Sequence, residues 1–403
     1  MVSYREPRLY FIFSTTLFAV IGVSLIAPIL PTMREELELD RAQIGLMVTF
    51  FTVPGIFLAP LAGIFADKYG RKAVLVPSLF IFGLAGSACA LVNQFEFLLL
   101  LRALQGIGGS GLMALATTII GDLYTGSDRA DVLGKNASVL SVGTATYPII
   151  GGFLAALLGW YAPFLLFFLA VPLGMLIWKF ADLPSPEKSS NPIKEYFHAT
   201  LLDLWNIEAL LSLLVGIYAF ILLYGALYAY SGEFLREKFE ADADVIGILL
   251  STSSISTAIF ASKARWIAER VSPLKIFTLS LVLQGIALGF IFIIPRIEYF
   301  LIVTFFFGAG HGLAVPILQS EIARQAPHER RGIVMSLLSS VIRTGQSLGP
   351  LLFGLLLTRF SLSQAFAMMA GITLFICFLL LLISPRAHRE QLLEISSPLV
   401  GIE

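Results

Sequence analysis

Charged residues are scarce in this chain of 403 residues, and this scarcity excludes an ordinary water-soluble domain. Only 13% of the residues are charged, whereas 57% are hydrophobic and the mean hydropathy is +0.86. Soluble domains carry about 25% charged residues. Apolar runs long enough to cross a bilayer as helices recur along the whole sequence. The composition therefore predicts an integral membrane protein.

Histidine and cysteine are also rare, and their rarity argues against an enzyme or a metalloprotein. The chain has four histidines and two cysteines, and both Cys89 and Cys377 fall inside apolar runs, where a thiol behaves as a small buried hydrophobe. The sequence contains no cluster of a nucleophile with a base, or of metal ligands, at one depth. We therefore expect no catalysis, cofactor, metal or nucleic-acid partner.

Twelve apolar segments are predicted to cross the membrane as α-helices. The chain begins with Arg5 and Arg8 ahead of a run without a cleavage pattern, so the first segment is expected to be retained. The predicted spans are residues 9–31, 43–66, 73–92, 97–121, 133–158, 161–181, 207–230, 245–262, 276–294, 299–323, 333–357 and 365–384.

A stretch rich in proline, serine and charge divides the chain. It runs from Leu183 to Pro192 without an apolar run, which is typical of a linker. We expect a six-helix bundle over residues 1–182, a linker over 183–206, and a second six-helix bundle over 207–403 that ends in a short tail. Nineteen lysines and arginines lie on the side of the 67–72 loop and six on the other. This bias places the linker and both termini in the cytoplasm of a cell-membrane protein.

An internal repeat predicts how the two halves are related. When the sequence is aligned with itself after a shift of 202 positions, glycine meets glycine at four places and proline meets proline at one. The glycine pairs are 106 and 308, 108 and 310, 143 and 345, and 152 and 354, and the proline pair is 148 and 350. Such a parallel repeat is found in transporters whose halves are related by an axis along the membrane normal. The sequence therefore predicts an all-α transporter with two pseudo-symmetric bundles.

Three motifs carry a family resemblance. The loop Gly63-Ile-Phe-Ala-Asp67-Lys68-Tyr-Gly70-Arg71-Lys72 places an acid between two glycines and three basic residues. Residues 102–108 read Arg-Ala-Leu-Gln-Gly-Ile-Gly, and residues 143–152 read Gly-Thr-Ala-Thr-Tyr-Pro-Ile-Ile-Gly-Gly. With these motifs the chain resembles the major facilitator superfamily, within it the branch of drug:proton antiporters. The third motif departs from the antiporter signature, because Tyr147 stands where the family has glycine.

The resemblance implies a role for each motif. The loop would act as a gating latch, in which Arg71 pairs with Asp122 and Asp67 is stabilised by Arg129 and a helix end. The glycines and prolines of two helices would allow bending and close helix approach, although ordinary packing explains single glycines equally well. The residues given this role are Gly143, Pro148, Gly151, Gly152, Gly345, Gly349, Pro350 and Gly354. Residues 106–111 also satisfy a dinucleotide pattern, but they lie within an apolar span with no preceding strand, so we expect helix packing and no bound nucleotide there. The resemblance also places Gly106 in the coupling motif with Arg102 and Gln105.

Ionisable residues at membrane depth are candidates for function, because charge is costly there. The spans contain Arg102, His311 and Arg343, and no aspartate or glutamate lies deep inside any of them. Arg102 is expected to face the cavity together with Gln105. His311, with a reference pKa of about 6.5, either carries the coupled proton or is a neutral histidine bonded between helices. Arg343 either points into the cavity or pairs with carbonyls and Gln346.

Together these features predict a monomeric secondary transporter that works by alternating access. The first interpretation is proton-coupled efflux of small amphipathic compounds or drugs. The alternative is transport, including uptake, of organic anions such as acidic metabolites or siderophores, because two arginines and a histidine favour anionic cargo.

Overall fold

The structure is a computed structural model that describes residues 7–183, 206–325 and 331–396, and within these ranges all regular structure is helical. The predicted linker, residues 183–206, lies almost wholly outside the described residues, so the proposed domain boundaries stay a prediction. The first bundle consists of α1 (Pro7–Ser24), η1 (Ala27–Ile29), α2 (Leu30–Glu36), α3 (Arg41–Tyr69), α4 (Arg71–Ala88), η2 (Cys89–Leu91), α5 (Phe95–Gly109), α6 (Leu112–Leu123), α7 (Gly126–Leu158), α8 (Ala162–Leu165), η3 (Leu166–Leu169) and α9 (Ala170–Phe180). The second consists of α11 (Ile207–Ile221), η4 (Leu222–Tyr230), α12 (Ser231–Phe239), α13 (Ala243–Ala268), α14 (Pro273–Ile293), η5 (Ile297–Tyr299), α15 (Phe300–Arg324), α16 (Arg331–Leu357) and α17 (Leu362–Ser396).

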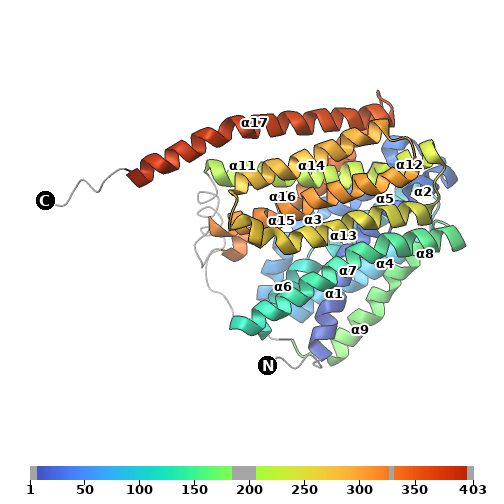
Figure 1. Cartoon of the computed structure of the whole chain (residues 1–403). Helices are drawn as coiled ribbons and strands as arrows, with labels where there is room; N and C mark the ends of the chain where they lie inside the picture. Colours follow the sequence, from blue (N-terminus) through green and yellow to red (C-terminus); the bar gives the residue numbers. More distant parts are fainter. Residues whose placement is uncertain (1–6, 184–205, 326–330, 397–403) are drawn as a thin grey trace.

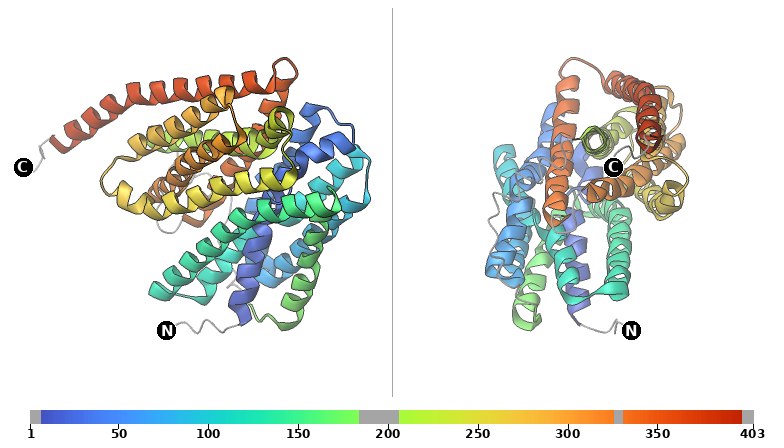
Figure 2. Two further views of the ribbon diagram at one scale, coloured as in Figure 1. Left: turned by 45° about the vertical axis from the view of Figure 1, so that its right-hand side comes forward. Right: turned by 90° about the vertical axis from the view of Figure 1, so that its left-hand side faces the viewer.

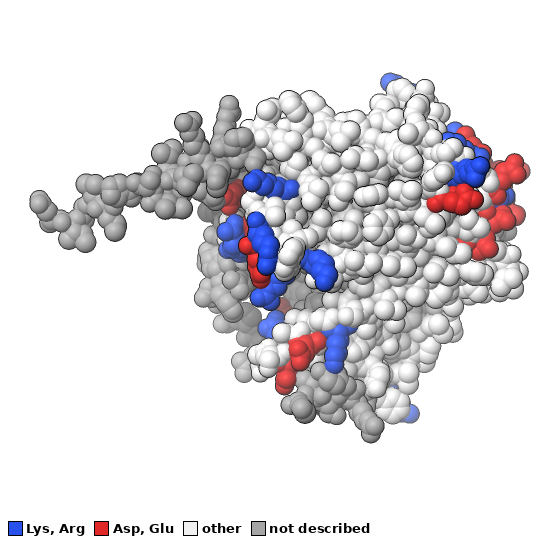
Figure 3. Space-filling model, viewed as in Figure 1, with Lys and Arg blue, Asp and Glu red and all other residues white. Residues whose placement is uncertain are grey.

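The predicted membrane fold is confirmed. Eleven continuous helical stretches of the described residues are long and apolar enough to cross a bilayer. The remaining predicted span, residues 333–357, corresponds to α16, which is 27 residues long and packs against α3 and α11. On the face drawn in Figure 3, the charged side chains gather toward two opposite ends and leave a broad uncharged belt between them.

Several predicted spans are less regular than the sequence suggested. The first span is interrupted after Ser24, where α1 gives way to η1, and the fourth is interrupted at Ser110 and Gly111 between α5 and α6. The seventh contains a nine-residue π-helix, η4, and continues as α12 to Phe239 rather than ending at Tyr230. The charged residues of α12 made its sequence look like a loop, but they pair with the first bundle and so keep the helix intact.

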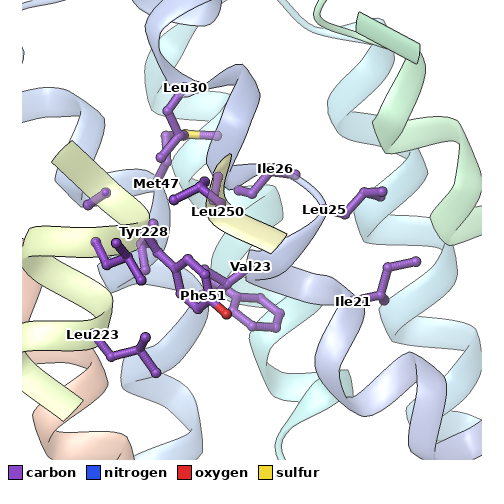
Figure 4. Close-up of a cluster of buried hydrophobic side chains, with 14 of the residues drawn as sticks. Ile21, Val23, Leu25, Ile26, Leu30, Met47, Phe51, Leu223, Tyr228 and Leu250 are labelled. Carbon is purple, nitrogen blue, oxygen red and sulfur yellow. The ribbon is translucent and has the colours of Figure 1, made fainter. Parts of the chain in front are cut away.

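The two bundles meet closely at one end and diverge toward the other. Figures 1 and 2 show α7 and α13 side by side at one end of the molecule and separating along their length. We call the end formed by residues 34–41 and 233–242 the closed end, and the end formed by residues 67–72 and 122–129 the motif end. An apolar core cluster shared by both bundles lies toward the closed end, where Leu223 and Tyr228 of η4 approach Val23 and Phe51 (Figure 4).

Glycines bring the bundles together at matching places in the two repeats. A Cβ built on Gly247 would lie 2.2 Å from the carbonyl oxygen of Pro148, and one built on Gly45 would lie 2.8 Å from that of Pro350. The shift of 202 positions relates these two contacts, because Gly45 corresponds to Gly247 and Pro148 corresponds to Pro350. Real Cβ atoms do not come so close to a backbone oxygen, so only glycine fits at both positions. The repeat seen in the sequence therefore builds two equivalent helix contacts between the bundles.

Candidate transport site and gates

The loop at the motif end forms a charge network within the first bundle. Gly70 has φ of +97°, a conformation that L side chains rarely adopt, and this turn ends α3 and starts α4. Arg71, which is nearly buried, donates from Nε to Asp122 over 2.8 Å and from Nη1 to Asp67. The expected contact between Arg71 and Asp122 is therefore present. It ties the start of α4 to the ends of α3 and α6.

The other residues of the predicted latch lie nearby with different partners. Lys72 donates to the carbonyl oxygen of Ala181 over 2.9 Å, which ties α4 to the segment after α9. The predicted contact between Arg129 and Asp67 is not among the ion pairs of the described residues. The guanidinium of Arg129 packs over Gly121, 3.0 Å from where a Cβ would lie, and Asp67 instead pairs with Arg71, four residues later across the Gly70 turn.

Two further latch residues have few neighbours in this structure. A Cβ built on Gly63 would meet no atom within 4 Å, and Lys68 lies over the ring of Tyr69, 5.2 Å from its centroid. None of the hydrogen bonds or ion pairs that we find among the described residues of the motif end links the two bundles. The latch role therefore stays a prediction about another state of the protein.

Arg102 lies inside the first bundle and does not face a cavity. Its side chain is fully buried and donates to the carbonyl oxygens of Gly22 (2.8 Å) and Met47 (3.1 Å) and to Oε1 of Gln105 (2.5 Å). The guanidinium also stacks on Phe51, 4.4 Å from the ring centroid. The expected neighbour Gln105 is present, but the expected exposure is wrong because the protein itself satisfies the cation.

The break in the first span explains how a buried cation is satisfied without an acid. After Ser24 the helix tightens, and the amide of Ile26 bonds to Val23 rather than to Gly22. The carbonyl of Gly22 is therefore released from the helix ladder and accepts a charged donor instead. Arg102 thus holds the interrupted first span against α3 and α5.

Arg343 is the one predicted arginine that reaches the boundary between the bundles. It lies on α16, and its Cδ and Nε are each 3.0 Å from the position of a Cβ built on Gly55 of α3. No ion pair or hydrogen bond of its guanidinium is found with the described residues, and Gln346 does not pair with it, since the Oε1 of Gln346 is buried without a partner. A free cation at this boundary can attract an anionic ligand.

Aromatic side chains on the seventh span line the same region. Tyr224 interacts electrostatically with Arg343, and its ring lies 6.4 Å from Phe220 and 5.5 Å from Tyr228 between centroids. Both tyrosines belong to the π-helix η4, and π-helical turns are frequent at functional sites. We did not single them out in the sequence, although the four-residue spacing of Phe220, Tyr224 and Tyr228 was the signal.

His311 lies in α15 against this aromatic row. It is 6% exposed, its ring meets Phe220 edge to face at 5.0 Å, and its Nδ1 is buried without a hydrogen-bond partner. Nδ1 of His311 therefore makes no hydrogen bond to a neighbouring helix in this structure. Whether His311 carries a proton stays a prediction.

The predicted bending residues serve close helix approach in this structure. The helices α7 and α16 continue through their prolines, Pro148 and Pro350, without interruption. A Cβ on each of six glycines would come within 3 Å of a neighbouring segment. The glycines and the groups they approach are Gly143 at Leu17, Gly151 at Leu25, Gly152 at Ala243, Gly345 at Ile217, Gly349 at Ile221, and Gly354 at Tyr230. Gly106 likewise packs on the carbonyl of Phe51, as expected for helix packing.

Three ion pairs join the bundles at the closed end. Arg34 lies 2.7 Å from Glu233, and Arg41 lies 2.6 Å from Glu237. Arg236 donates to both carboxylate oxygens of Glu35, over 3.0 and 3.1 Å. The sequence gives these arginines a part only in the orientation of the chain, and it gives none of the glutamates a partner. Their partners lie about 200 positions away, so nothing local in the sequence indicates the pairing.

Comparison with known proteins decides the family. The sequence matches the Major Facilitator Superfamily over residues 12–239 and 213–401. The chain belongs to the major facilitator superfamily. Among curated members of the superfamily it is 29% identical to the bacillibactin exporter of Bacillus subtilis (86% of this chain, 89% of the relative) and 27% identical to multidrug resistance protein 1 of the same organism (85% and 88%).

Further relatives in the superfamily extend this likeness. The class D tetracycline resistance protein of Salmonella ordonez is 27% identical over 85% of this chain and 88% of its own length. Among solved structures, the nucleoside transporter NupG has a TM-score of 0.78 at 15% identity, covering 93% of this chain and 98% of its own, which supports the shared fold alone. The predicted recognition as a superfamily transporter that resembles drug exporters is thus confirmed.

Proposed function

We propose that this transporter works by alternating access and exports small amphipathic compounds in exchange for protons. The observation that carries the proposal is the asymmetry between the two ends of the molecule. Three ion pairs and two glycine contacts join the bundles toward the closed end, whereas the polar contacts found at the motif end stay within single bundles. Such an arrangement fits one state of a carrier whose central site opens to one side at a time.

The direction of opening follows from the distribution of basic residues. Nineteen lysines and arginines lie on the side of the 67–72 loop, against six on the other. We infer that the motif end faces the cytoplasm and the closed end faces outward. In this orientation the described state receives its cargo from the cytoplasm, which suits an exporter. The curated relatives, named as exporters and drug-resistance proteins, support the same direction.

A second candidate cargo is an organic anion, and the position of Arg343 favours it. Among the described aspartates and glutamates, only Glu233 has a buried side chain, and it lies at the closed end beside Arg34. The described acids therefore offer no site for a cationic compound near the centre of the membrane. Arg343 has no such partner and lies near Tyr224. An aromatic or phenolic anion would pair with the guanidinium and pack on the neighbouring rings. The likeness to a bacillibactin exporter agrees with this candidate.

Proton movement in liposomes tests both candidates. The purified protein is reconstituted with an imposed pH gradient, and cationic, neutral and anionic amphipathic compounds are added in turn. Discharge of the gradient by any class supports the proposed function, and discharge by none overturns it. The control variant is Arg359→Gln, which changes an exposed arginine. If anions discharge the gradient in this variant but not in Arg343→Gln, the anion site is assigned to Arg343. Discharge by cations alone refutes the second candidate.

A further inference from the structure

Glu233 is the only aspartate or glutamate with a buried side chain among those that the structure describes. It is 1% exposed and lies on α12, opposite Arg34 of α2 in the other bundle. Buried carboxylates persist only where they are paired or take up a proton. Glu233 is thus buried by the docking of the two bundles.

The pairing of Glu233 with Arg34 is incomplete. Nε of Arg34 lies 2.7 Å from Oε1 of Glu233, but this N–H makes no well-directed hydrogen bond, and Oε2 of Glu233 is buried with no partner at all. A charged carboxylate normally accepts several hydrogen bonds. The second oxygen is therefore a vacant position at which a proton can bind.

The repeat shows that Glu233 is an addition to a symmetric arrangement. Under the 202-residue shift, Arg34 corresponds to Arg236 and Glu35 to Glu237, while Glu233 corresponds to Pro31. Arg236 pairs with Glu35, so the symmetric partner of Arg34 would be Glu237. Arg34 instead turns to Glu233, one helical turn deeper, and Glu237 pairs with Arg41. Glu233 diverts Arg34 from an exposed pair into a buried one.

We propose that Glu233 is a proton-binding group that controls the closed end. When charged, Glu233 holds Arg34 and fastens the bundles together. When a proton occupies its carboxyl group, Arg34 loses its charged partner and the closed end opens more easily. The other groups that face Glu233 are Glu35 on α2, Arg41 on α3, and Tyr230 and Glu237 on its own span.

The inference rests on the proposed function, because it assumes that this end opens during transport. Two spin labels measure the opening directly. They are placed on cysteines at Asn93 and Glu298, exposed positions at the closed end of the first and second bundles, after Cys89 and Cys377 have been replaced by serine. The distance distribution is recorded for the full-length reconstituted protein between pH 5 and 8 by double electron–electron resonance.

Four proteins give distinct expected results. In the wild type, acid raises the ratio of long to short distances by about tenfold or more, because a buried ion pair is broken. Glu233→Gln has the raised ratio at every pH. Arg34→Gln reverses the response, since acid then neutralises a buried carboxylate that has lost its partner. Glu237→Gln, the matched control at an exposed acid that also pairs across the bundles, keeps the pH response of the wild type.

The inference is overturned if the label distances of Glu233→Gln respond to pH as those of the wild type do. It is also overturned if acid shifts the distances of Arg34→Gln in the same direction as in the wild type. Correct folding of each variant is checked by its elution as a single species in detergent. Failure of the inference is separable from failure of the proposed function. If the wild type discharges a pH gradient in liposomes but its label distances ignore pH, the transporter assignment stands and the role of Glu233 is refuted.

Discussion

Replacement of Arg102 by methionine is expected to destabilise the first bundle rather than to remove proton coupling alone. The wild-type guanidinium donates to the carbonyl oxygens of Gly22 and Met47 and to Gln105, all of them buried. Methionine keeps much of the apolar contact of the side chain but donates to none of these acceptors. The structure thus gives Arg102 a positioning role, in place of the cavity-facing role that its sequence motif suggested.

The size of the effect follows from the two main-chain acceptors. A buried acceptor left without a partner costs about 1–3 kcal/mol, so the two carbonyl oxygens together give about 2–6 kcal/mol. Loss of the stacking on Phe51 adds up to about 2 kcal/mol. Removal of a buried positive charge works in the opposite direction, because that charge no longer has to be desolvated. We therefore expect a net loss of about 3–5 kcal/mol, as for other broken buried networks.

The measurement is the free energy of unfolding in a denaturing detergent titration of the purified protein. The matched control is Thr304→Val, because Thr304 is the repeat counterpart of Arg102, is also fully buried, and bonds only to carbonyls of its own helix. That variant should change the free energy by less than about 1.5 kcal/mol. If Arg102→Met unfolds like the wild type but fails to move protons, the structural reasoning is wrong and Arg102 acts in coupling.

Three further variants test the latch, the histidine and the glycine contacts. Asp67→Asn should slow transport by about tenfold or more without lowering the amount of protein in the membrane, because a charge-assisted bond is lost; normal turnover removes the latch hypothesis. His311→Ala should flatten the pH dependence of transport between about pH 5.5 and 7.5 if this group carries the proton, and an unchanged profile makes it structural. Gly247→Leu should prevent the approach to Pro148 and lengthen the closed-end label distance, whereas Gly371→Leu, at a glycine with no atom near its Cβ position, should not.

The fold could be predicted from the sequence because its signals are local or periodic. Long apolar runs gave the spans, and the shift of 202 positions gave the equivalence of the halves. The same shift predicts contacts in detail: Gly106 packs on the carbonyl of Phe51, and its counterpart Gly308 packs on the carbonyl of Ser253. A small residue repeated at the same place in two halves marks a close approach that both halves share.

The environment of individual charges could not be predicted in the same way. Arg102 looked like a cavity residue because charge is costly at membrane depth. Its partners include the carbonyl of Gly22, which is released by a helix break that the sequence does not reveal. The pairing of Arg34 with Glu233 depends on how two bundles dock across a boundary. In both cases the partner is set by tertiary structure, and composition and spacing describe only one side of the contact.

The repeat nevertheless offers a way to find such residues. The glycine contacts that build the scaffold occur in both halves, so they belong to the architecture. Three ionisable side chains at membrane depth or at the boundary between the bundles have uncharged counterparts instead. Arg102 corresponds to Thr304, Arg343 to Ser141, and Glu233 to Pro31. A duplicated scaffold does not need a charge in only one copy, and burying a charge is costly. Positions where the halves differ in charge are therefore where this transporter departs from its own symmetry. They are the first places to look for the steps that make its cycle directional.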